Sequence, residues 1–178
     1  MSLAETSGAL DAGTAARLAC DGYLLLQGAV PASLIEPLRA AFDAGELPSD
    51  AWPVPRSADW RHALVDLDPA VQQTCRLPAL LAAAQLVLRR PFFLAQVEGR
   101  EPAAGGGLQN LHRDGPDPTL TLTVSALVFL DPYGPGNGGT RVLAGTHAGA
   151  GLQIAAGVEH PGAAVLCGEA GDILVFDA

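Results

Sequence analysis

Residues 110–130 read NLHRDGPDPTLTLTVSALVFL, and this stretch decides both the fold that we expect and the chemistry that it supports. Its second part, residues 119–130, begins with period-two alternation, with threonine and serine on one face and leucine and valine on the other. Such alternation is typical of a strand with one apolar and one polar face. The polar face fits a strand lining a ligand cavity in a small barrel, although a solvated outer face gives the same pattern.

The first part of the stretch places His112 and Asp114 two residues apart, shortly after a glycine-rich loop at 105–107. In an extended segment, side chains at i and i+2 leave the backbone on the same side, so the imidazole and the carboxylate can converge. An imidazole and a carboxylate are two of the three ligands of the 2-His-1-carboxylate triad, which leaves coordination positions open on non-haem Fe(II). A surface cluster with a local hydrogen bond is the commoner meaning of such a triplet taken alone. We therefore treat both residues as candidate metal ligands and catalytic residues.

The composition excludes several classes of function. All ten basic residues are arginine, so the chain lacks the lysine of a Walker A loop, a protein kinase or a pyridoxal phosphate enzyme. The formal net charge is −9, and no basic cluster extends beyond Arg89 and Arg90. Because phosphate binding needs a basic face, we expect no nucleic-acid partner.

The length of 178 residues and the hydrophobic content of 49% suit one domain, residues 1–178, with a substantial core. Cys20, Cys75 and Cys167 are odd in number and in no CxxC pattern, so we interpret them as buried small hydrophobes rather than disulfide or zinc partners. The sequence has neither a signal-peptide pattern nor an apolar run of about 18 residues. We expect a protein of the reducing cytoplasm that does not enter a membrane.

Residues 1–90 are expected to form a mostly helical cover, as judged from apolar periodicity and from signals for helix ends. The expected elements are a helix over 9–20 with Leu10, Leu18 and Cys20 inside, a strand over 23–26, a helix opened by the capping box Ser33-x-x-Glu36 and ended by Gly45, further helix starts at Pro69 and Pro78, and a buried helix over 79–88.

The segment 48–61 is rich in proline and has no period, which indicates a loop that packs over the rest of the chain. Trp52, Trp60 and His62 are candidates for lining a substrate entrance. Ordinary anchoring of a loop by its aromatic side chains is the commoner explanation.

Residues 91–178 read as short strands separated by glycine-rich turns, which is typical of a jelly roll. Strand-like segments are 92–97, 119–130, 140–143, 163–167 and 173–176. The loop between the second and third of these contains a literal G-x-G-x-x-G at Gly134, Gly136 and Gly139. We reject a dinucleotide site there, because its third glycine should open a helix and strand-like residues follow instead.

Four segments in this order resemble the phytanoyl-CoA dioxygenase family of Fe(II)/2-oxoglutarate oxygenases. Asp21-Gly22-Tyr23 resembles the family's "DGY" strand entry, and residues 111–114 (LHRD) resemble its His-x-Asp ligand segment. Residues 137–147 (NGGTRVLAGTH) resemble its "NG-x-x-x-v-x-GSH" turn and strand, and residues 171–176 (GDILVF) resemble its "GD-x-x-x-F" strand. Each is weak alone, but together they cover about residues 21–178.

The resemblance implies a double-stranded β-helix, cupin-like and of mixed α+β class, with residues 1–90 as helical cover and residues 91–178 as an incomplete β core. It implies Fe(II), 2-oxoglutarate and O2 as cofactors, with hydroxylation of an unactivated C–H bond of a small or medium organic metabolite. An aspartate at position 114 speaks against the halogenase branch, which has a small residue there. Gln96 and Arg100 lie where family members often carry polar contacts to cosubstrate or substrate, although a surface Arg-Glu pair explains Arg100 equally well.

The resemblance also has a gap. In the family, a distal ligand histidine and an arginine that pairs with 2-oxoglutarate follow the last motif, and neither occurs before Ala178. His147 matches the structural histidine of "GSH" and His160 lies in a loop, so we expect neither as third ligand. We expect both missing residues and the last strands beyond Ala178, or else a member that has lost the triad. An open sheet edge would leave the chain unstable or dimeric, so monomer and homodimer both stay open.

Two other classes of function compete with the oxygenase. One is a catalytically silent β-helix binding module without the distal histidine and arginine, and the other is a cupin-like metal enzyme or isomerase with a different ligand set. The substrate itself is not readable from the sequence, because the residues that select it lie in the cover and the loops.

Overall fold

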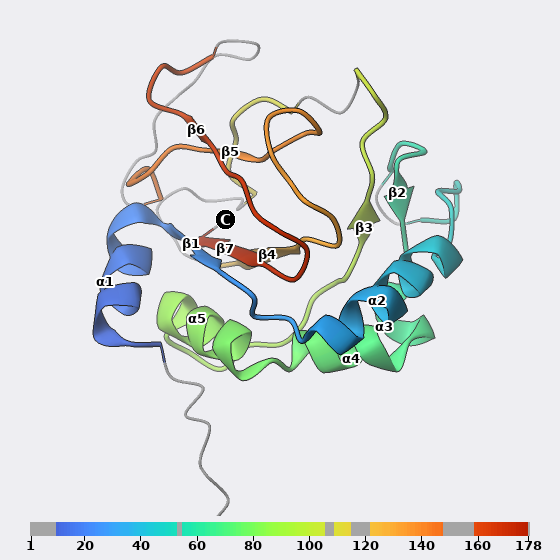
Figure 1. Ribbon diagram of the computed structural model, residues 1–178, viewed down its shortest axis with the longest axis horizontal. Coiled ribbons are helices and arrows are strands. Elements are labelled where there is room, and N and C mark those ends of the chain that lie inside the picture. Colours follow the sequence, from blue (N-terminus) through green and yellow to red (C-terminus); the bar gives the residue numbers. More distant parts are fainter. Residues whose placement is uncertain (1–9, 53–54, 106–108, 115–121, 148–158, 178) are drawn as a thin grey trace, which may run out of the picture.

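The computed structural model describes residues 10–52, 55–105, 109–114, 122–147 and 159–177. Within these ranges a mostly helical N-terminal part is followed by a strand-rich C-terminal part (Figure 1). The helices are α1 (Ala12–Asp21), α2 (Ala32–Ala44), α3 (Leu64–Leu67), α4 (Pro69–Cys75) and α5 (Pro78–Leu88). The strands are β1 (Tyr23–Leu26), β2 (Trp60–Arg61), β3 (Gly99–Arg100), β4 (Val124–Val128), β5 (Arg141–Val142), β6 (Ala164–Val165) and β7 (Ile173–Asp177).

The central sheet has the strand order β1-β7-β4, with both pairs antiparallel. Its middle strand therefore comes from the end of the described chain, and the first strand forms one edge. Leu174 lies between Leu25 of β1 and Leu127 of β4 in the register. The remaining strands form two short ribbons, β2–β3 and β5–β6.

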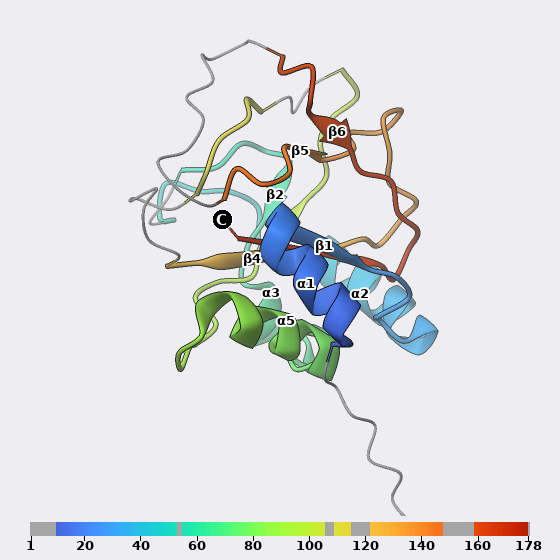
Figure 2. The ribbon, with the colours of Figure 1, turned by 90° about the vertical axis from the view of Figure 1, so that its left-hand side faces the viewer.

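The helices pack against one face of this sheet and make the core. Figures 1 and 2 agree in placing α5 on one side of the sheet and the β5–β6 ribbon on the other. The helix-facing side chains of the sheet join α1, α2, α4 and α5 in one cluster of buried residues. Its most buried members are Leu18, Ala41, Ala83, Ile173 and Val175.

The central strand is buried on both faces. Ile173 and Val175 are inside the helix-facing cluster, and Leu174, which points the other way, is also 0% exposed. This continuous burial explains why the last strand reads as an unbroken apolar run rather than as an alternating one.

The predicted helix starts at Pro69 and Pro78 are confirmed, and α1 begins at Ala12, within the range 9–20 predicted for it. Asp11 accepts a hydrogen bond from the Thr14 amide at 3.0 Å and opens α1, and Asp68 accepts one from the Ala70 amide at 2.6 Å and opens α4. Pro69 and Pro78 occupy first helical positions, as expected for a residue without an amide hydrogen. The predicted strand at 23–26 is β1, and α2 ends before Gly45 as predicted.

Three expectations about the cover and its surroundings are wrong. Helix α2 begins at Ala32 behind Pro31 without a side-chain cap, so Ser33 lies inside the helix and the capping box does not form. Residues 92–97 are not a strand, and Phe93 is 85% exposed, because this segment pairs with no neighbour among the described residues. Cys20 and Cys167 are exposed rather than buried, because they lie on outward faces, and only Cys75 is half-buried.

The alternating run is only partly recovered as a strand. Residues 119–121 lie outside the described part of the chain, and β4 covers Val124–Val128 alone. Val124 packs against the core as predicted, whereas Leu122, expected on the same apolar face, is 42% exposed. Leu122 precedes the paired residues, so neither the sheet nor a helix covers it.

The glycine-rich loop 131–139 leads into a strand rather than into a helix, as predicted. The Asn137 side chain accepts a hydrogen bond from the Gly134 amide at 2.8 Å and donates one to the Pro132 carbonyl at 2.6 Å. These bonds close the loop on itself, and β5 rather than a helix follows. A helix N-terminus for a pyrophosphate is therefore missing at this loop.

The Asp21-Gly22-Tyr23 motif contacts the Gly145-Thr146-His147 motif at the end of α1. Gly22 has φ +79°, and a Cβ atom there would overlap Nδ1 and Cγ of His147. The His147 Nε2 atom lies 3.2 Å from the Ala19 carbonyl oxygen, and the Gly145 amide donates to the Asp21 carbonyl at 2.9 Å. His147 therefore ties the turn after β5 to the end of α1, which is the structural role expected of it.

The Gly171-Asp172 pair has a similar structural purpose. The Asp172 carboxylate is 5% exposed and accepts hydrogen bonds from the Gly28 amide at 2.7 Å and the Glu169 amide at 2.9 Å. It thereby joins the turn after β1 to the turn that enters β7. Gly171, with φ +97°, provides the backbone conformation that this turn requires.

Candidate functional site

His112 and Asp114 converge as the i, i+2 spacing predicts. The Nε2 atom of His112 lies 3.2 Å from Oδ1 of Asp114, and both side chains are about half exposed, at 52% and 49%. The other ring nitrogen, Nδ1, lies 2.6 Å from the carbonyl oxygen of Asn110. A carbonyl cannot donate, so Nδ1 carries the hydrogen of this bond.

The imidazole thus lies between two acceptors. With Nδ1 donating to Asn110, the Nε2 atom faces the Asp114 carboxylate and is available to a metal ion. Two ligand atoms about 2.1 Å from one metal ion and at right angles are about 3.0 Å apart, close to the observed 3.2 Å. The separation of the two atoms is therefore compatible with both binding one metal ion.

A third ligand does not join them in the described part of the chain, where no cluster of three His, Cys, Asp or Glu side chains is found. His62 stacks against Trp52, with ring centroids 4.5 Å apart. His147 holds the corner at Gly22, and His160 accepts a hydrogen bond from the Gly162 amide at 3.1 Å. Each has a structural contact of its own.

The two residues proposed for cosubstrate contacts lie in a network of ion pairs. Gln96 is exposed, and its Nε2 atom donates to Glu98 at 3.4 Å. Arg100 donates through Nε to Asp59 at 3.0 Å and through Nη1 to the Gln109 side chain at 2.9 Å. A hydrogen bond from the Ser57 hydroxyl, together with the Arg100 charge, holds the pKa of Asp59 below its ordinary value.

The aromatic residues of the loop 48–61 form a packed wall beside this network. The guanidinium groups of Arg56 and Arg100 lie 4.6 and 5.4 Å from the centre of the Trp60 ring. Arg56 also pairs with Glu98 at 3.1 Å. Trp60 begins strand β2, which pairs with β3, so part of the predicted loop is a short strand. These contacts favour anchoring over a substrate entrance for Trp60.

Sequence reasoning missed two residues close to the candidate ligands. The Arg141 Nη2 atom donates to the Gln109 carbonyl at 2.7 Å, and Nη1 donates to Glu159 at 3.3 Å. Gln109 is therefore contacted by Arg100 through its side chain and by Arg141 through its main chain. An arginine within the strand-like segment 140–143 was the one available signal.

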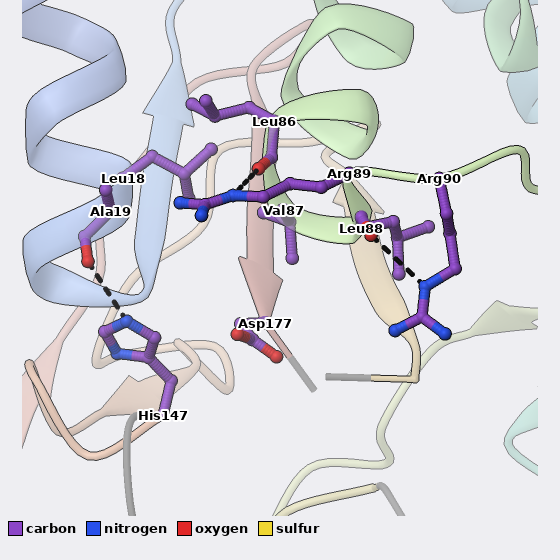
Figure 3. Close-up of a pocket in the computed structure, with 9 residues that line it drawn as sticks. All are labelled: Leu18, Ala19, Leu86, Val87, Leu88, Arg89, Arg90, His147 and Asp177. Atoms are coloured by element: carbon purple, nitrogen blue, oxygen red, sulfur yellow. Dashed lines mark hydrogen bonds between the residues drawn. The ribbon is translucent and has the colours of Figure 1, made fainter. Parts of the chain in front are cut away.

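A cavity of about 410 Å³ lies between α1 and the end of α5 (Figure 3). In this view Asp177 lies between His147 and the arginines that follow α5. Arg89 and Arg90 donate through Nε to the Leu86 and Leu88 carbonyls at 3.4 and 3.2 Å. None of the predicted site residues lines this cavity. It is separate from the candidate metal site.

The arrangement of a half-exposed imidazole and carboxylate on a β-rich scaffold under a helical cover can be compared with known proteins. The family model described as phytanoyl-CoA dioxygenase (PhyH) matches residues 18–178. The chain belongs to this family. The predicted family is thus confirmed, and Fe(II), 2-oxoglutarate and O2 agree with the cofactors of the phytanoyl-CoA dioxygenases. No curated protein matches the sequence closely enough to count as a relative.

Solved structures show the same fold. EctD from S. alaskensis, crystallised with 2-oxoglutarate and 5-hydroxyectoine, superposes with TM-score 0.74 at 19% identity, over 99% of this chain and 70% of EctD. HygX from Streptomyces hygroscopicus, with nickel and 2-oxoglutarate bound, gives 0.69 at 19% identity, over 95% and 78% of the two chains. SnoN, a non-haem alpha-ketoglutarate-dependent epimerase from nogalamycin biosynthesis, gives 0.66 at 19% identity, over 93% and 70%. At such identity the likeness shows the fold alone.

The structure has mixed helices and sheets, in agreement with the predicted α+β class. No helix in the described ranges combines the length and the apolar character that crossing a bilayer requires.

Proposed function

We propose that this phytanoyl-CoA dioxygenase family member is a non-haem oxygenase that uses Fe(II), 2-oxoglutarate and O2 to hydroxylate a small or medium organic metabolite. The observation that carries the proposal is the convergence of His112 Nε2 and Asp114 Oδ1 at 3.2 Å within a chain of this family. The donor set fits the metal, since an imidazole nitrogen and a carboxylate oxygen are two ligands of the facial triad.

In this proposal His112 and Asp114 would bind the iron through the imidazole Nε2 atom and the carboxylate. The Asn110 carbonyl fixes the imidazole through Nδ1 and leaves Nε2 for the metal. Bound iron and 2-oxoglutarate supply the oxidising chemistry, and the protein supplies binding and orientation. Gln96 and Arg100 stay our candidates for polar contacts to cosubstrate or substrate, and the third ligand stays a prediction.

The small-molecule substrate is supported by the neighbours, of which one was crystallised with hygromycin B and another with 5-hydroxyectoine. SnoN is described as an epimerase, so this fold also carries reactions other than hydroxylation. We further propose that the scaffold is a double-stranded β-helix and that the protein works in the cytoplasm as a monomer or homodimer. Light scattering of the purified full-length protein separates the two oligomeric states.

Anaerobic titration of the full-length protein with Fe(II) and 2-oxoglutarate tests the assignment. We expect a weak visible charge-transfer band in the wild type and its loss in His112→Ala and in Asp114→Asn. Asp43→Asn, an exposed carboxylate on α2, is the matched control and should keep the band. Addition of O2, with ascorbate as the two-electron reductant in place of the unidentified substrate, should then convert 2-oxoglutarate to succinate and CO2.

A wild-type protein that gives no band and consumes no 2-oxoglutarate would support the silent binding module instead. A band that survives both ligand substitutions would point to a different ligand set. Succinate formation with a substrate that gains no oxygen atom would exclude hydroxylation while leaving the cofactors in place.

A further inference from the structure

Gln109 is held at two points by two guanidinium groups from different parts of the fold. Arg100, in the β2–β3 ribbon, donates to its side-chain oxygen at 2.9 Å. Arg141, in the β5–β6 ribbon, donates to its main-chain oxygen at 2.7 Å. One exposed loop residue thereby connects two ribbons that do not pair with each other.

Both guanidinium groups are partly buried, and Arg100 also has a partly buried carboxylate partner. The Arg100 side chain is 25% exposed and pairs with Asp59, whose side chain is 14% exposed. The Arg141 side chain is 19% exposed, whereas its partner Glu159 is 84% exposed. Charge-assisted bonds from such partly buried donors are stronger than bonds between neutral groups. They can fix the position of Gln109, which is itself exposed.

The residue after Gln109 is the one that orients the imidazole. The Asn110 carbonyl accepts the bond from His112 Nδ1 at 2.6 Å, and His112 Nε2 then faces Asp114. A rotation of the peptide at Gln109 or Asn110 would move this carbonyl and release the ring. Partners of this kind around a metal-binding histidine commonly change metal affinity by about 10- to 100-fold when they are removed.

We propose that Arg141 and Arg100 are positioning residues that clamp Gln109 so that the Asn110 carbonyl keeps His112 Nε2 directed at the metal position. The proposal rests on the proposed function in taking His112 as a metal ligand. It gives Arg141 a role at the site although Arg141 contacts neither candidate ligand in the described structure.

The test measures local order and metal affinity separately in the full-length protein. Hydrogen exchange of the metal-free protein reports on residues 109–114, and titration with Co²⁺ alone, followed by its visible absorption, reports on the metal site. For Arg141→Gln we expect faster exchange confined to this segment and about 10-fold weaker Co²⁺ binding. Arg141→Lys, which keeps a cationic donor, should recover part of the affinity.

Two further variants separate the clamp from its neighbours. Glu159→Gln removes the ion pair of Arg141 but leaves the bond to Gln109, so exchange and Co²⁺ affinity should stay at wild-type values. Gln109→Ala removes the Arg100 contact alone and should give a smaller change in the same direction. It also keeps the test informative if Arg141→Gln does not fold.

Wild-type exchange and Co²⁺ affinity in both Arg141→Gln and Gln109→Ala would overturn the proposal. Faster exchange spread over the central sheet would also overturn it, because Arg141 would then support the whole fold. A wild-type protein that binds no Co²⁺ removes the proposed function. In that case the exchange data on the metal-free protein still decide whether the clamp orders the loop.

Discussion

The centre of the β1–β7–β4 sheet and the segment that carries His112 and Asp114 are held by different forces. Ile173, Leu174 and Val175 are 0% exposed and are fixed by apolar contacts on both faces. The two candidate ligands are about half exposed, and Gln109, just before them in the sequence, accepts charge-assisted hydrogen bonds from Arg100 and Arg141.

The central sheet thus determines the stability of the fold, whereas the hydrogen bonds near His112 and Asp114 determine how the candidate ligands are oriented. Apolar burial contributes most of the folding free energy but has no preferred direction, so it builds the scaffold. Hydrogen bonds contribute less net free energy but fix the orientation of a side chain. Substitutions in the central sheet should therefore lower the free energy of unfolding. Substitutions around His112 and Asp114 should instead lower the metal affinity and leave the free energy of unfolding nearly unchanged.

The largest loss of stability is expected for Leu174→Ala. Removing a fully buried leucine leaves a cavity and should lower the free energy of unfolding by about 3 kcal/mol. Leu47→Ala, at a leucine that is 62% exposed, is the control and should change it by less than about 0.5 kcal/mol. Urea denaturation followed by circular dichroism measures both, and equal effects would contradict the burial pattern.

Gly22→Ala is expected to cost about 2 kcal/mol, because the left-handed backbone and the His147 ring both oppose a side chain. Gly28→Ala is the matched control, since Gly28 has φ +58° with nothing within 4 Å of the added atom. It should cost about 1 kcal/mol from the backbone alone. The difference between the stability losses of the two variants, measured by thermal unfolding, gives the contribution of the His147 contact. Identical losses would show that this contact does not add to the cost of the Gly22 substitution.

Asp59→Asn is expected to lower stability by less than about 1 kcal/mol, because solvent screens a partly exposed pair. The pKa of Asp59 is lowered by the Ser57 hydroxyl and by Arg100, so its contribution is present above the ordinary aspartate pKa. That contribution is lost as the pH falls through the lowered pKa. The stability difference between wild type and variant should therefore shrink in acid, and urea midpoints at several pH values measure it.

The smallest effect on stability is expected for His112→Ala and Asp114→Ala. Both side chains are half exposed and bury little apolar surface, so each change should stay within about 0.5 kcal/mol. Metal affinity should fall in both while the thermal midpoint of the metal-free protein stays constant. A large loss of stability would place these residues in the scaffold rather than in the site.

The sequence predicted much of the helical cover, because its signals are local. Pro69, Pro78 and Gly45 mark helix ends through their own backbone geometry, and no distant partner has to be known. The predicted strand at 92–97 was wrong for the opposite reason, since a strand forms only where another strand pairs with it. The alternation after Thr119 likewise says nothing about which neighbour will cover each face.

The candidate ligands were predictable because the convergence of His112 and Asp114 follows from the geometry of three consecutive residues. The clamp on Gln109 was not, because Arg141 is 32 residues away in the sequence and reaches it only through the fold. Composition gave no hint either, since any of the ten arginines was an equal candidate.

The contact between Gly22 and His147 bears on how relatives of this chain should be recognised. The Asp-Gly-Tyr entry and the Gly-Thr-His turn are two halves of a single joint, although Gly22 and His147 are 125 positions apart in the sequence. The presence of one of them therefore constrains the residue at the other. A candidate with a bulky residue in place of this glycine, but with the histidine intact, would need a rebuilt corner before it could be accepted as a member.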